Sequence, residues 1–325
     1  MERKMKWLIT GGCGFIGTAL IKSLVDEGGH FVRVVDNLSV GTRDDLARVC
    51  EYDEAGDAGV QLLVGDIMDE ALALDAGRDM DVIVHLAANP GVGPSVENPR
   101  LDCVTNVIGT LNYLESARAN GIRRFVFASS GAPVGECIPP IHEEMAPHPV
   151  SPYGASKLAG EGYCSAYFRT YGVETVSLRF GNVYGPGSGH KSSVVAKFIR
   201  QALKGEMLEV YGDGRQTREF IYIEDLVGAI RKAAEVPGVG GEVFQIATGS
   251  ETTVGEMLEI LFAEFERRGI RGVRFVNGEK RLGDIVRNFS DTSKAGRMLG
   301  WQVQTQLAEG IGTTIDSFLS GSTPG

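Results

Sequence analysis

Long apolar runs are absent from this chain of 325 residues. Because a membrane-spanning helix needs about eighteen or more consecutive apolar residues, no such helix is expected. The five cysteines are scattered and form no Cys-x-x-Cys pair, which indicates free thiols in a reducing compartment rather than a disulfide framework. Glycines interrupt the apolar stretch that follows the basic N-terminus, which a secretion signal would tolerate poorly. We therefore expect a cytoplasmic protein.

Positive charge is scarce as well. The chain has 32 Lys and Arg against 42 Asp and Glu, for a formal net charge of −10. This balance argues against binding to nucleic acid or to an acidic membrane surface, while local cationic groups still allow a small anionic ligand. We expect no nucleic-acid partner, no membrane partner and no metal site.

Short apolar segments alternate with helical patterns through the first 180 residues. Each segment is about five residues long, which is typical of buried strands. Alternating strands and helices predict an α/β fold with a doubly wound parallel sheet, whose ligands bind beyond the carboxyl ends of the strands. The expected strands are residues 6–10, 31–35, 60–64, 82–86, 124–128 and 175–180, with a long helix over about 104–120.

The pattern becomes less regular after Gly181, where loops rich in glycine and serine appear. We expect helices over 194–203 and 255–268 and a strand over 218–223. The chain is accordingly divided into a first domain, 1–180, and a smaller C-terminal lobe, 181–325. A segment near 217–249 is expected to return to the first domain.

A glycine-rich loop, Thr10-Gly-Gly-Cys-Gly-Phe-Ile-Gly17, joins the first expected strand to the first expected helix. Glycines let the backbone turn tightly and approach a pyrophosphate, which the N-terminus of a helix attracts. Asp36 ends the second strand, where a carboxylate accepts hydrogen bonds from an adenosine ribose and repels a 2′-phosphate. These features predict NAD rather than NADP, although Arg43 nearby could contact a phosphate. An ordinary glycine turn and a helix-capping aspartate are the plainer alternatives.

Tyr153 and Lys157 lie four residues apart in the stretch Ser-Pro-Tyr-Gly-Ala-Ser-Lys. On a helix, positions i and i+4 share one face, so the phenol and the ammonium can lie side by side. A nearby cation favours the phenolate, which lowers the pKa of the tyrosine and makes it a proton acceptor near neutral pH. The spacing alone is weak, because a solvated surface pair has the same pattern.

Taken with these motifs, the chain resembles the extended short-chain dehydrogenase/reductase family, in its nucleotide-sugar epimerase/dehydratase group, over nearly its whole length. The segments that match in order and spacing are residues 11–17, 36–39, 65–67, 85–88, 106–110, 129–130, 153–157, 179–186, 212–218, 225 and 281–284. The resemblance implies a Rossmann-type NAD-binding domain followed by a nucleotide-sugar-binding lobe. It also implies NAD contacts from Gly11, Gly14, Phe15, Ile16, Gly17, Asp36, Asn37, Ser39, Gly41, Asp66, Ile67, Leu86, Ala87, Ala88, Asn106, Ser129, Tyr153, Lys157 and Phe180.

The resemblance also implies catalytic and substrate-binding roles. Ser130 would hydrogen-bond the sugar 4-hydroxyl, Tyr153 would be the acid/base, and Lys157 would bind the nicotinamide ribose and lower the tyrosine pKa. Two arginines can neutralise a diphosphate that a protein of charge −10 would otherwise repel. The implied substrate-binding residues are Ser130, Asn182, Tyr211, Arg218, Arg281, Asp284 and Asn288.

Departures from the family pattern indicate the reaction. Dehydratases of this group carry an Asp-Glu pair after the catalytic hydroxyl, and its decarboxylases carry a glutamate two residues after it, whereas Gly131 and Ala132 follow Ser130 here. Elimination therefore lacks its base, and reversible oxidation remains. The following Pro133-Val-Gly135 replaces the usual Val-Tyr-Gly and puts the identity of the sugar in doubt, as does Asn288, a residue of intermediate size.

The sequence thus predicts NAD-dependent 4-epimerisation of a UDP-hexose, of the UDP-glucose/UDP-galactose type, through a transient 4-keto sugar. The alternatives are a 4-epimerase of a UDP-uronate, with His190 or Lys191 contacting its carboxylate, a 4-epimerase of a UDP-N-acetylhexosamine, and a 4-keto-sugar reductase. A catalytically silent nucleotide-binding module is a further alternative, against which the intact Ser130, Tyr153 and Lys157 argue. The resemblance also implies a homodimer formed by helices near 100–118 and 153–170.

Overall fold

The computed structural model describes residues 4–191, 193–279 and 287–320. Its largest element is a seven-stranded parallel sheet with the strand order β3-β2-β1-β4-β5-β6-β9. This is the predicted doubly wound sheet, and the six strands expected from sequence agree with the structure to within one residue at each end. The strands are β1 (Lys6–Thr10), β2 (Phe31–Asp36), β3 (Val60–Val64), β4 (Val82–His85), β5 (Arg124–Ala128), β6 (Glu174–Arg179) and β9 (Glu242–Gln245).

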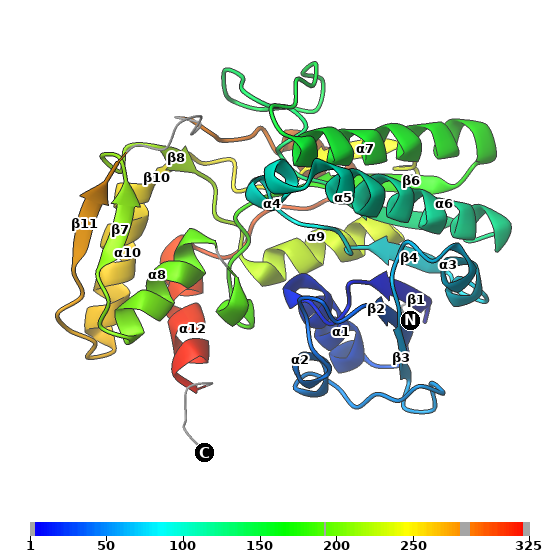
Figure 1. Ribbon diagram of the computed structural model, residues 1–325, viewed down its shortest axis with the longest axis horizontal. Coiled ribbons are helices and arrows are strands. Elements are labelled where there is room, and N and C mark those ends of the chain that lie inside the picture. The colour runs from blue at the N-terminus through cyan, green and yellow to red at the C-terminus, as the bar shows by residue number, and fades with distance from the viewer. Residues whose placement is uncertain (1–3, 192, 280–286, 321–325) are drawn as a thin grey trace.

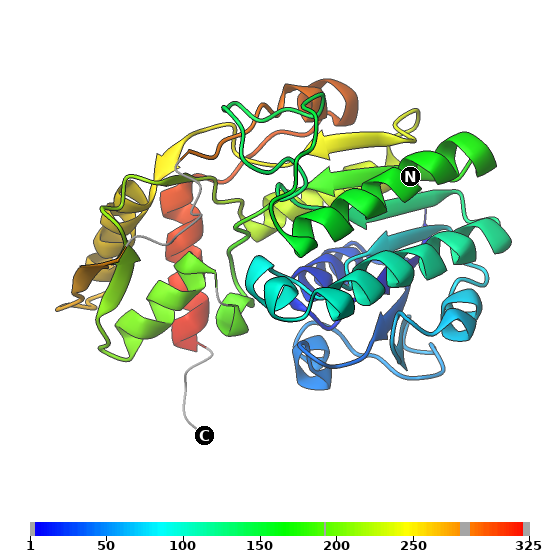
Figure 2. The ribbon, with the colours of Figure 1, turned by 45° about the horizontal axis from the view of Figure 1, so that its top comes forward.

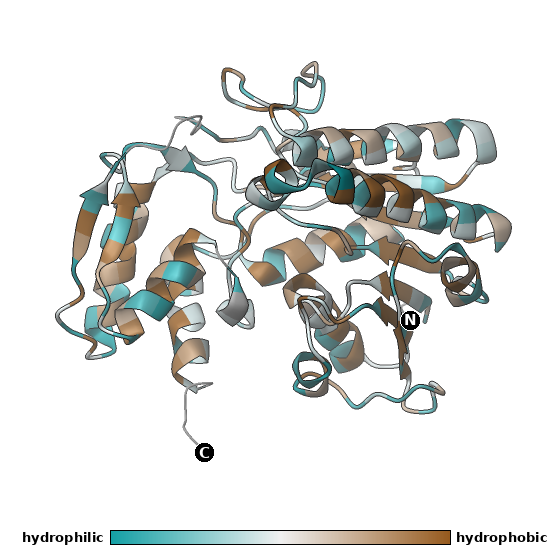
Figure 3. Cartoon of the chain, viewed as in Figure 1, coloured by the Kyte–Doolittle hydropathy of each residue, from teal (hydrophilic) through white to brown (hydrophobic). Residues whose placement is uncertain are grey.

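Helices cover both faces of this sheet (Figures 1 and 2). On one face lie α1 (Phe15–Glu27) and α9 (Ile223–Glu235), and on the other lie α3 (Glu70–Ala76), α6 (Gly109–Ala119) and α7 (Pro152–Tyr171). Successive residues of a strand point to opposite faces, so Val126 of β5 joins the first core while Phe125 and Phe127 join the second. Both faces are apolar, as Figure 3 shows for the central strands, because neither face meets water.

A smaller lobe lies beside the sheet, on the left in Figure 1. It contains α8 (Val194–Leu203), α10 (Val254–Arg267) and α12 (Leu307–Ser320), together with β7 (Leu208–Tyr211) paired in parallel with β11 (Phe275–Gly278). A short antiparallel pair, β8 (Thr217–Arg218) and β10 (Thr252–Thr253), lies at the upper end of this lobe in Figure 1. The remaining helices are α2 (Arg43–Ala47), α4 (Val92–Glu97), α5 (Pro99–Cys103), α11 (Ser293–Leu299), a π-helix (Val104–Ile108) and a 3-10 helix (Ser188–His190).

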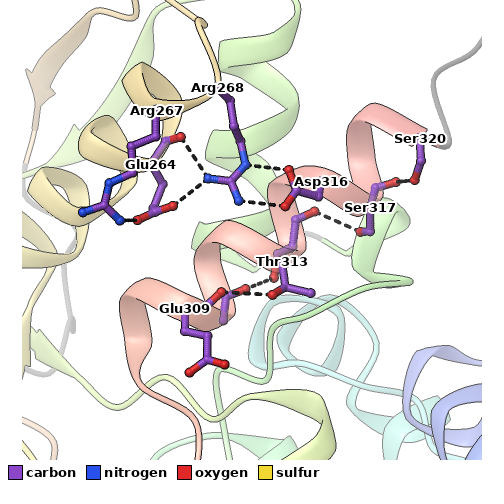
Figure 4. Close-up of polar contacts among 10 residues, drawn as sticks. Glu264, Arg267, Arg268, Glu309, Thr313, Asp316, Ser317 and Ser320 are labelled. Atoms are coloured by element: carbon purple, nitrogen blue, oxygen red, sulfur yellow. Dashed lines mark hydrogen bonds and ion pairs between the residues drawn. The ribbon is translucent and has the colours of Figure 1, made fainter.

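An ion-pair network joins α12 to α10 (Figure 4). Arg268 donates to both carboxylate oxygens of Asp316 at 2.6 and 2.7 Å and to Glu264 Oε2 at 2.6 Å. Gly312 allows this approach, since a Cβ there would lie 2.8 Å from both Arg268 Nη2 and Glu264 Oε2. The last described helix, α12, is therefore held against α10 by ion pairs as well as by its apolar face.

The chain passes repeatedly between the two lobes. It leaves the sheet after β6, builds α8 and β7, returns as α9 and β9, and leaves again for α10 and β11. α11 then packs against β9 and α9 before α12 completes the small lobe. The predicted domain boundaries at residue 180 and around 217–249 stay predictions.

Two predicted elements differ from the structure. The continuous strand expected over 218–223 is wrong, because the β8 ladder ends at Arg218 and Ile223 already opens α9. Between them lie the buried residues Phe220, Ile221 and Tyr222, whose only sheet-like pairing in the described chain is an isolated parallel bridge from Tyr222 to Tyr184. The helix expected over 104–120 contains a π-helical turn at its start.

Among the described residues, none of the helices has the length and apolar character needed to cross a membrane.

Candidate active site

The glycine loop packs tightly at the carboxyl end of β1. Gly11 has a φ of +69°, and a Cβ on it would lie 2.9 Å from the amide nitrogen of Ala87. A Cβ on Gly17 would lie 2.5 Å from the carbonyl oxygen of Gly11. Gly14 is the N-cap of α1 and offers no side chain to its free N–H groups. The first turn of α1 can therefore donate hydrogen bonds to a pyrophosphate.

Asp36 faces this loop from the end of β2. Its Oδ2 accepts a hydrogen bond from Cys13 N at 2.9 Å and its Oδ1 one from Leu38 N at 2.8 Å. Burial raises the pKa of Asp36, and these two hydrogen bonds oppose that rise. A carboxylate has about four acceptor sites, so a ribose diol can still bind. Arg43, the residue that could contact a phosphate, has its Nη2 3.6 Å from Glu54 Oε1.

The loop after β2 is built around the same site. Gly41 lies so close to the glycine loop that a Cβ would be 2.2 Å from Cys13 O. Asn37 Nδ2 donates to Asp66 Oδ2 at 2.9 Å, and Ser39 N donates to Asn37 Oδ1 at 3.1 Å. The structure therefore brings these four predicted NAD contacts together with Asp36. The residues present fit an adenosine diphosphate at this edge of the sheet.

Other predicted NAD contacts follow β3 and β4. Ile67 is buried, and a Cβ on Gly109 would lie 2.6 Å from its Cδ1. Ala87 N donates to Thr10 Oγ1 at 3.2 Å, which places the segment Leu86, Ala87 and Ala88 beside the end of β1. Asn106 is held by Asn89, since its Oδ1 accepts from Asn89 N at 2.7 Å. Phe180 packs, partly buried, against the core beyond β6. Their roles toward NAD stay predictions.

Tyr153 and Lys157 lie on the first turns of α7. Ser151 caps this helix by accepting a hydrogen bond from Gly154 N at 3.1 Å, and Pro152 takes the first helical position. Lys157 Nζ donates to Ala128 O at 2.8 Å and lies 5.9 Å from the centre of the Tyr153 ring. Tyr153 is also hydrogen-bonded to the Ser130 side chain. The three predicted catalytic side chains therefore meet at the ends of β5 and α7.

The electrostatics of this group differ from the prediction. Burial raises the pKa of Tyr153, the Ser130 hydrogen bond lowers it, and the charge of Asp102 raises it again. Burial lowers the pKa of Lys157 to about 8, while Asp102 and Glu161 oppose that change. The expectation that Lys157 lowers the tyrosine pKa is therefore wrong for this structure. Both groups lose hydration, which disfavours both of their charged forms.

Sequence analysis missed two buried carboxylates behind the site. Glu161 accepts from Arg179 Nε and Nη2 at 2.8 and 2.7 Å and from Ser129 Oγ at 2.5 Å. Asp102 Oδ1 accepts from Asn106 Nδ2 at 2.9 Å, and its Oδ2 has no hydrogen-bond partner within the described part of the chain. The i+4 spacing of Glu161 from Lys157 was the available signal for the first. The Ser129 hydroxyl donates its proton to this network, and the predicted NAD contact of Ser129 stays a prediction.

Four of the predicted substrate residues follow β6 in the described part of the chain. Asn182 has a φ of +46°, and the ring of Tyr211 lies 5.4 Å from Lys197 Nζ. Arg218 Nη1 donates to Thr217 O at 2.7 Å, and Asn288 N donates to Thr217 Oγ1 at 3.0 Å. Arg218 and Asn288 are therefore close in the fold. The predicted Arg281 and Asp284 lie outside the described residues.

The unusual loop after Ser130 is tied to the same region. Ile141 N donates to Phe289 O, and Asp291 N donates to Ile141 O, both at 2.8 Å. Glu143 Oε1 accepts from Gln245 N at 2.8 Å, so this carboxylate anchors the loop to the end of β9. The loop therefore reaches the segment that contains Asn288. No group of three or more His, Cys, Asp and Glu side chains in the described ranges is arranged to hold a metal ion.

Known proteins share this architecture. A model of the NAD dependent epimerase/dehydratase family matches residues 7–247. A UDP-glucose 4-epimerase of Mycolicibacterium smegmatis is 36% identical, with 98% of this chain and 100% of the relative covered. The structure of a Thermotoga maritima UDP-glucose 4-epimerase with UDP-glucose aligns with a TM-score of 0.88 at 35% identity, covering 98% and 99% of the two chains. A Thermus thermophilus UDP-glucose 4-epimerase in complex with NAD aligns at 0.85 with 34% identity, covering 98% and 100%.

These matches confirm the resemblance found in the sequence, the Rossmann-type fold and the cofactor. With a glycine loop and an acidic residue that fit NAD, and with Ser130, Tyr153 and Lys157 in contact, the chain belongs to the NAD-dependent epimerase/dehydratase family.

Proposed function

We propose that this protein is a UDP-sugar 4-epimerase that inverts C4 of a UDP-hexose of the UDP-glucose/UDP-galactose type. The observation that carries the proposal is the grouping of Ser130, Tyr153 and Lys157 in the structure. Gly131 and Ala132 follow Ser130, at the positions where enzymes that catalyse elimination have acidic residues. Such a set can move a proton at a hydroxyl but offers no base for a carbon-bound proton. Oxidation at C4 and its reversal therefore account for the residues present.

In this mechanism Tyr153, as phenolate, removes the proton from the 4-hydroxyl, which Ser130 holds by a hydrogen bond. NAD, held by the glycine loop, Asp36 and Lys157, would supply the reversible hydride acceptor for C4. The 4-keto sugar turns about its diphosphate so that its opposite face meets the cofactor, and Tyr153 returns the proton to the 4-oxygen. Atoms and electrons balance over the cycle, so no external reductant is consumed.

Lys157 is proposed to hold the nicotinamide ribose of NAD beside Tyr153. One of its three ammonium protons is donated to Ala128 O, and the others remain available for a ribose hydroxyl. With its pKa near 8, Lys157 carries its charge over most of the neutral range. The Ser130 hydrogen bond opposes the burial that raises the pKa of Tyr153.

The diphosphate is proposed to bind between the lobes. Arg218 from β8 and Arg281 supply positive charge, Asn182 supplies an amide, and Tyr211 lies near the nucleobase. Asp284 follows Arg281 in the same sequence motif. Asn288 is fixed beside β8 through Thr217 Oγ1, which supports a role for it in limiting the size of the sugar.

The alternative substrates and the alternative reductase activity each require a different feature of the site or of the reaction. A UDP-uronate needs a cation at the sugar carboxylate, but Lys191 contacts the glycine loop instead, so this observation favours the neutral hexose. A UDP-N-acetylhexosamine needs space beside Asn288. A 4-keto-sugar reductase would consume NADH in proportion to product, whereas an epimerase would not.

The decisive experiment compares wild type with Tyr153→Phe on UDP-glucose, UDP-N-acetylglucosamine and UDP-glucuronate, following anomeric signals by NMR. We expect 4-epimer from UDP-glucose and a loss of at least about a hundredfold in the variant, as for removal of a general acid/base, with NAD still bound. The control is Tyr163→Phe on the exposed face of the same helix, which should retain activity. Near-normal turnover by Tyr153→Phe would contradict the mechanism.

We further propose a cytoplasmic homodimer. All five cysteines are free, which is consistent with a reducing compartment. Leu101, Ile108, Tyr163 and Tyr171 on α5, the π-helix and α7 leave apolar surface exposed. α6 and α7 run side by side on the outside of the sheet (Figure 1), so a second copy could cover this face.

A further inference from the structure

Lys191 lies in an unexpected position for a lysine in a polar loop. It follows the 3-10 helix Ser188–His190, in a stretch rich in glycine and serine for which the sequence leaves solvation as one interpretation. In the structure its Nζ lies 4.9 Å from the centre of the Phe15 ring. Phe15 is the first residue of α1 and belongs to the glycine loop. A residue beyond the first 180 therefore reaches the cofactor-binding edge of the sheet.

The backbone that carries Lys191 is firmly held. Lys191 N donates to Ser188 O at 2.9 Å, and Ser188 Oγ donates to Gly185 O at 2.6 Å. Arg200 of α8 donates to Gly189 O at 2.6 Å. A Cβ on Gly187 would lie 3.6 Å from the Phe15 ring, so the turn itself rests on the first residue of α1.

Lys191 is partly buried, and its ammonium has no acidic partner in the part of the chain that the structure describes. Desolvation is what lowers its pKa, with no carboxylate acting on it. A buried cation is costly unless an anion compensates it. The cation–π contact with Phe15 compensates only in part, so the arrangement calls for a negatively charged ligand.

The position of Phe15 identifies that ligand. The N-terminus of α1 is where the glycine loop favours a pyrophosphate, and Gly14 leaves the first-turn N–H groups without a side-chain cap. We propose that Lys191 binds the pyrophosphate of NAD, clamping it against the N-terminus of α1 from the side of the smaller lobe.

This assignment has a consequence for turnover. An epimerase returns the hydride to its product, so it need not release NAD between turnovers. A pyrophosphate contact from Lys191, which lies beyond the first 180 residues, would slow the release of NAD. The inference rests on the NAD cofactor but not on the identity of the sugar.

The test measures binding instead of activity. NAD, adenosine and UDP are titrated by calorimetry into cofactor-stripped wild type, Lys191→Met, Lys191→Arg and Lys204→Met, the last a control at an exposed lysine just after α8. Since a charge-assisted hydrogen bond contributes about 1.5–3 kcal/mol, Lys191→Met should weaken NAD binding about 10- to 100-fold. Its affinity for adenosine and for UDP should stay within about twofold of wild type, and Lys191→Arg should recover most of the loss.

The possible outcomes separate the proposal about Lys191 from the assignment of NAD as the cofactor. Unchanged NAD affinity in Lys191→Met, or a loss confined to UDP, would overturn the proposal. An equal loss for adenosine would show damage to the whole site and would also count against it, and circular dichroism of each variant checks folding. Failure of the wild type to bind NAD would instead contradict the cofactor assignment.

Discussion

Replacing Glu161 with glutamine should destabilise the folded protein by about 3–5 kcal/mol, because it leaves a buried guanidinium without its counter-charge. The Glu161 and Arg179 side chains are only 5% and 4% exposed. Glutamine keeps the shape of the side chain, yet its NH₂ group would face the Arg179 N–H groups as donor against donor. Arg179 Nη1 already has no hydrogen-bond partner among the described residues, so the guanidinium cannot find compensation nearby.

Urea unfolding followed by circular dichroism, at one NAD concentration for all variants, gives the free energies. The set is wild type, Glu161→Gln, Arg179→Met and the double variant, which should be less destabilised than the sum of the single changes. Asp26→Asn is the control, because its pair with Lys22 is 62% and 57% exposed and should contribute less than about 0.5 kcal/mol. A cost below about 1 kcal/mol for Glu161→Gln would refute the reasoning.

The same variant also tests the link to the active site. The negative charge of Glu161 raises the pKa of Lys157, opposing the burial that lowers it to about 8. Removing this charge should lower the pKa of Lys157 further and move the alkaline limb of kcat/KM to lower pH. An unchanged limb would show that Glu161 acts through packing alone.

Two further predictions concern pH and assembly. Burial, assisted by the charge of Lys157, lowers the pKa of His85 from 6.5 to about 3, so below pH 6.5 the unfolded chain binds a proton that the folded protein does not. The free energy of unfolding should therefore fall as pH drops from 6.5 toward 3, and this group should account for about 2 kcal/mol of the loss at pH 5. In urea unfolding at pH 7 and pH 5, His85→Gln should lose less stability between the two pH values than wild type. An equal loss in both proteins would contradict this prediction. Ile108→Lys, on the exposed π-helical turn, should convert the proposed dimer to monomer in sedimentation equilibrium, and a monomeric wild type would refute that assembly.

The parallel sheet was predictable because its central strands, such as β4 and β5, are buried on both faces and read as short apolar runs. The glycine loop and the Tyr153–Lys157 pair were predictable because their chemistry depends on local spacing. The segment 218–223 misled because apolar residues packed into a core resemble a strand, and only tertiary structure shows that its pairing beyond Arg218 is reduced to a single bridge between Tyr222 and Tyr184.

Charges inside the protein were the hardest to predict. The sequence shows that Tyr153 lies near Lys157 but not that Lys157 is buried and Tyr153 partly buried, so the direction in which the tyrosine pKa shifts was not predicted. The roles of Lys191 and Glu161 depend on their contacts with Phe15 and Arg179, which are distant from them in the sequence. Such contacts depend on how the lobes come together, which no local pattern records.

The return of β9 to the large sheet also affects how the protein is made. One edge of β6 stays unpaired until β9 has been synthesised, because β9 is the strand that pairs along that edge. β9 is complete only after Gln245 has left the ribosome. At ordinary synthesis rates the nascent chain carries an open strand edge for several seconds, and such edges recruit other strands. A fragment ending near residue 180 would keep that edge permanently, so we expect it to aggregate rather than persist as an independent nucleotide-binding unit.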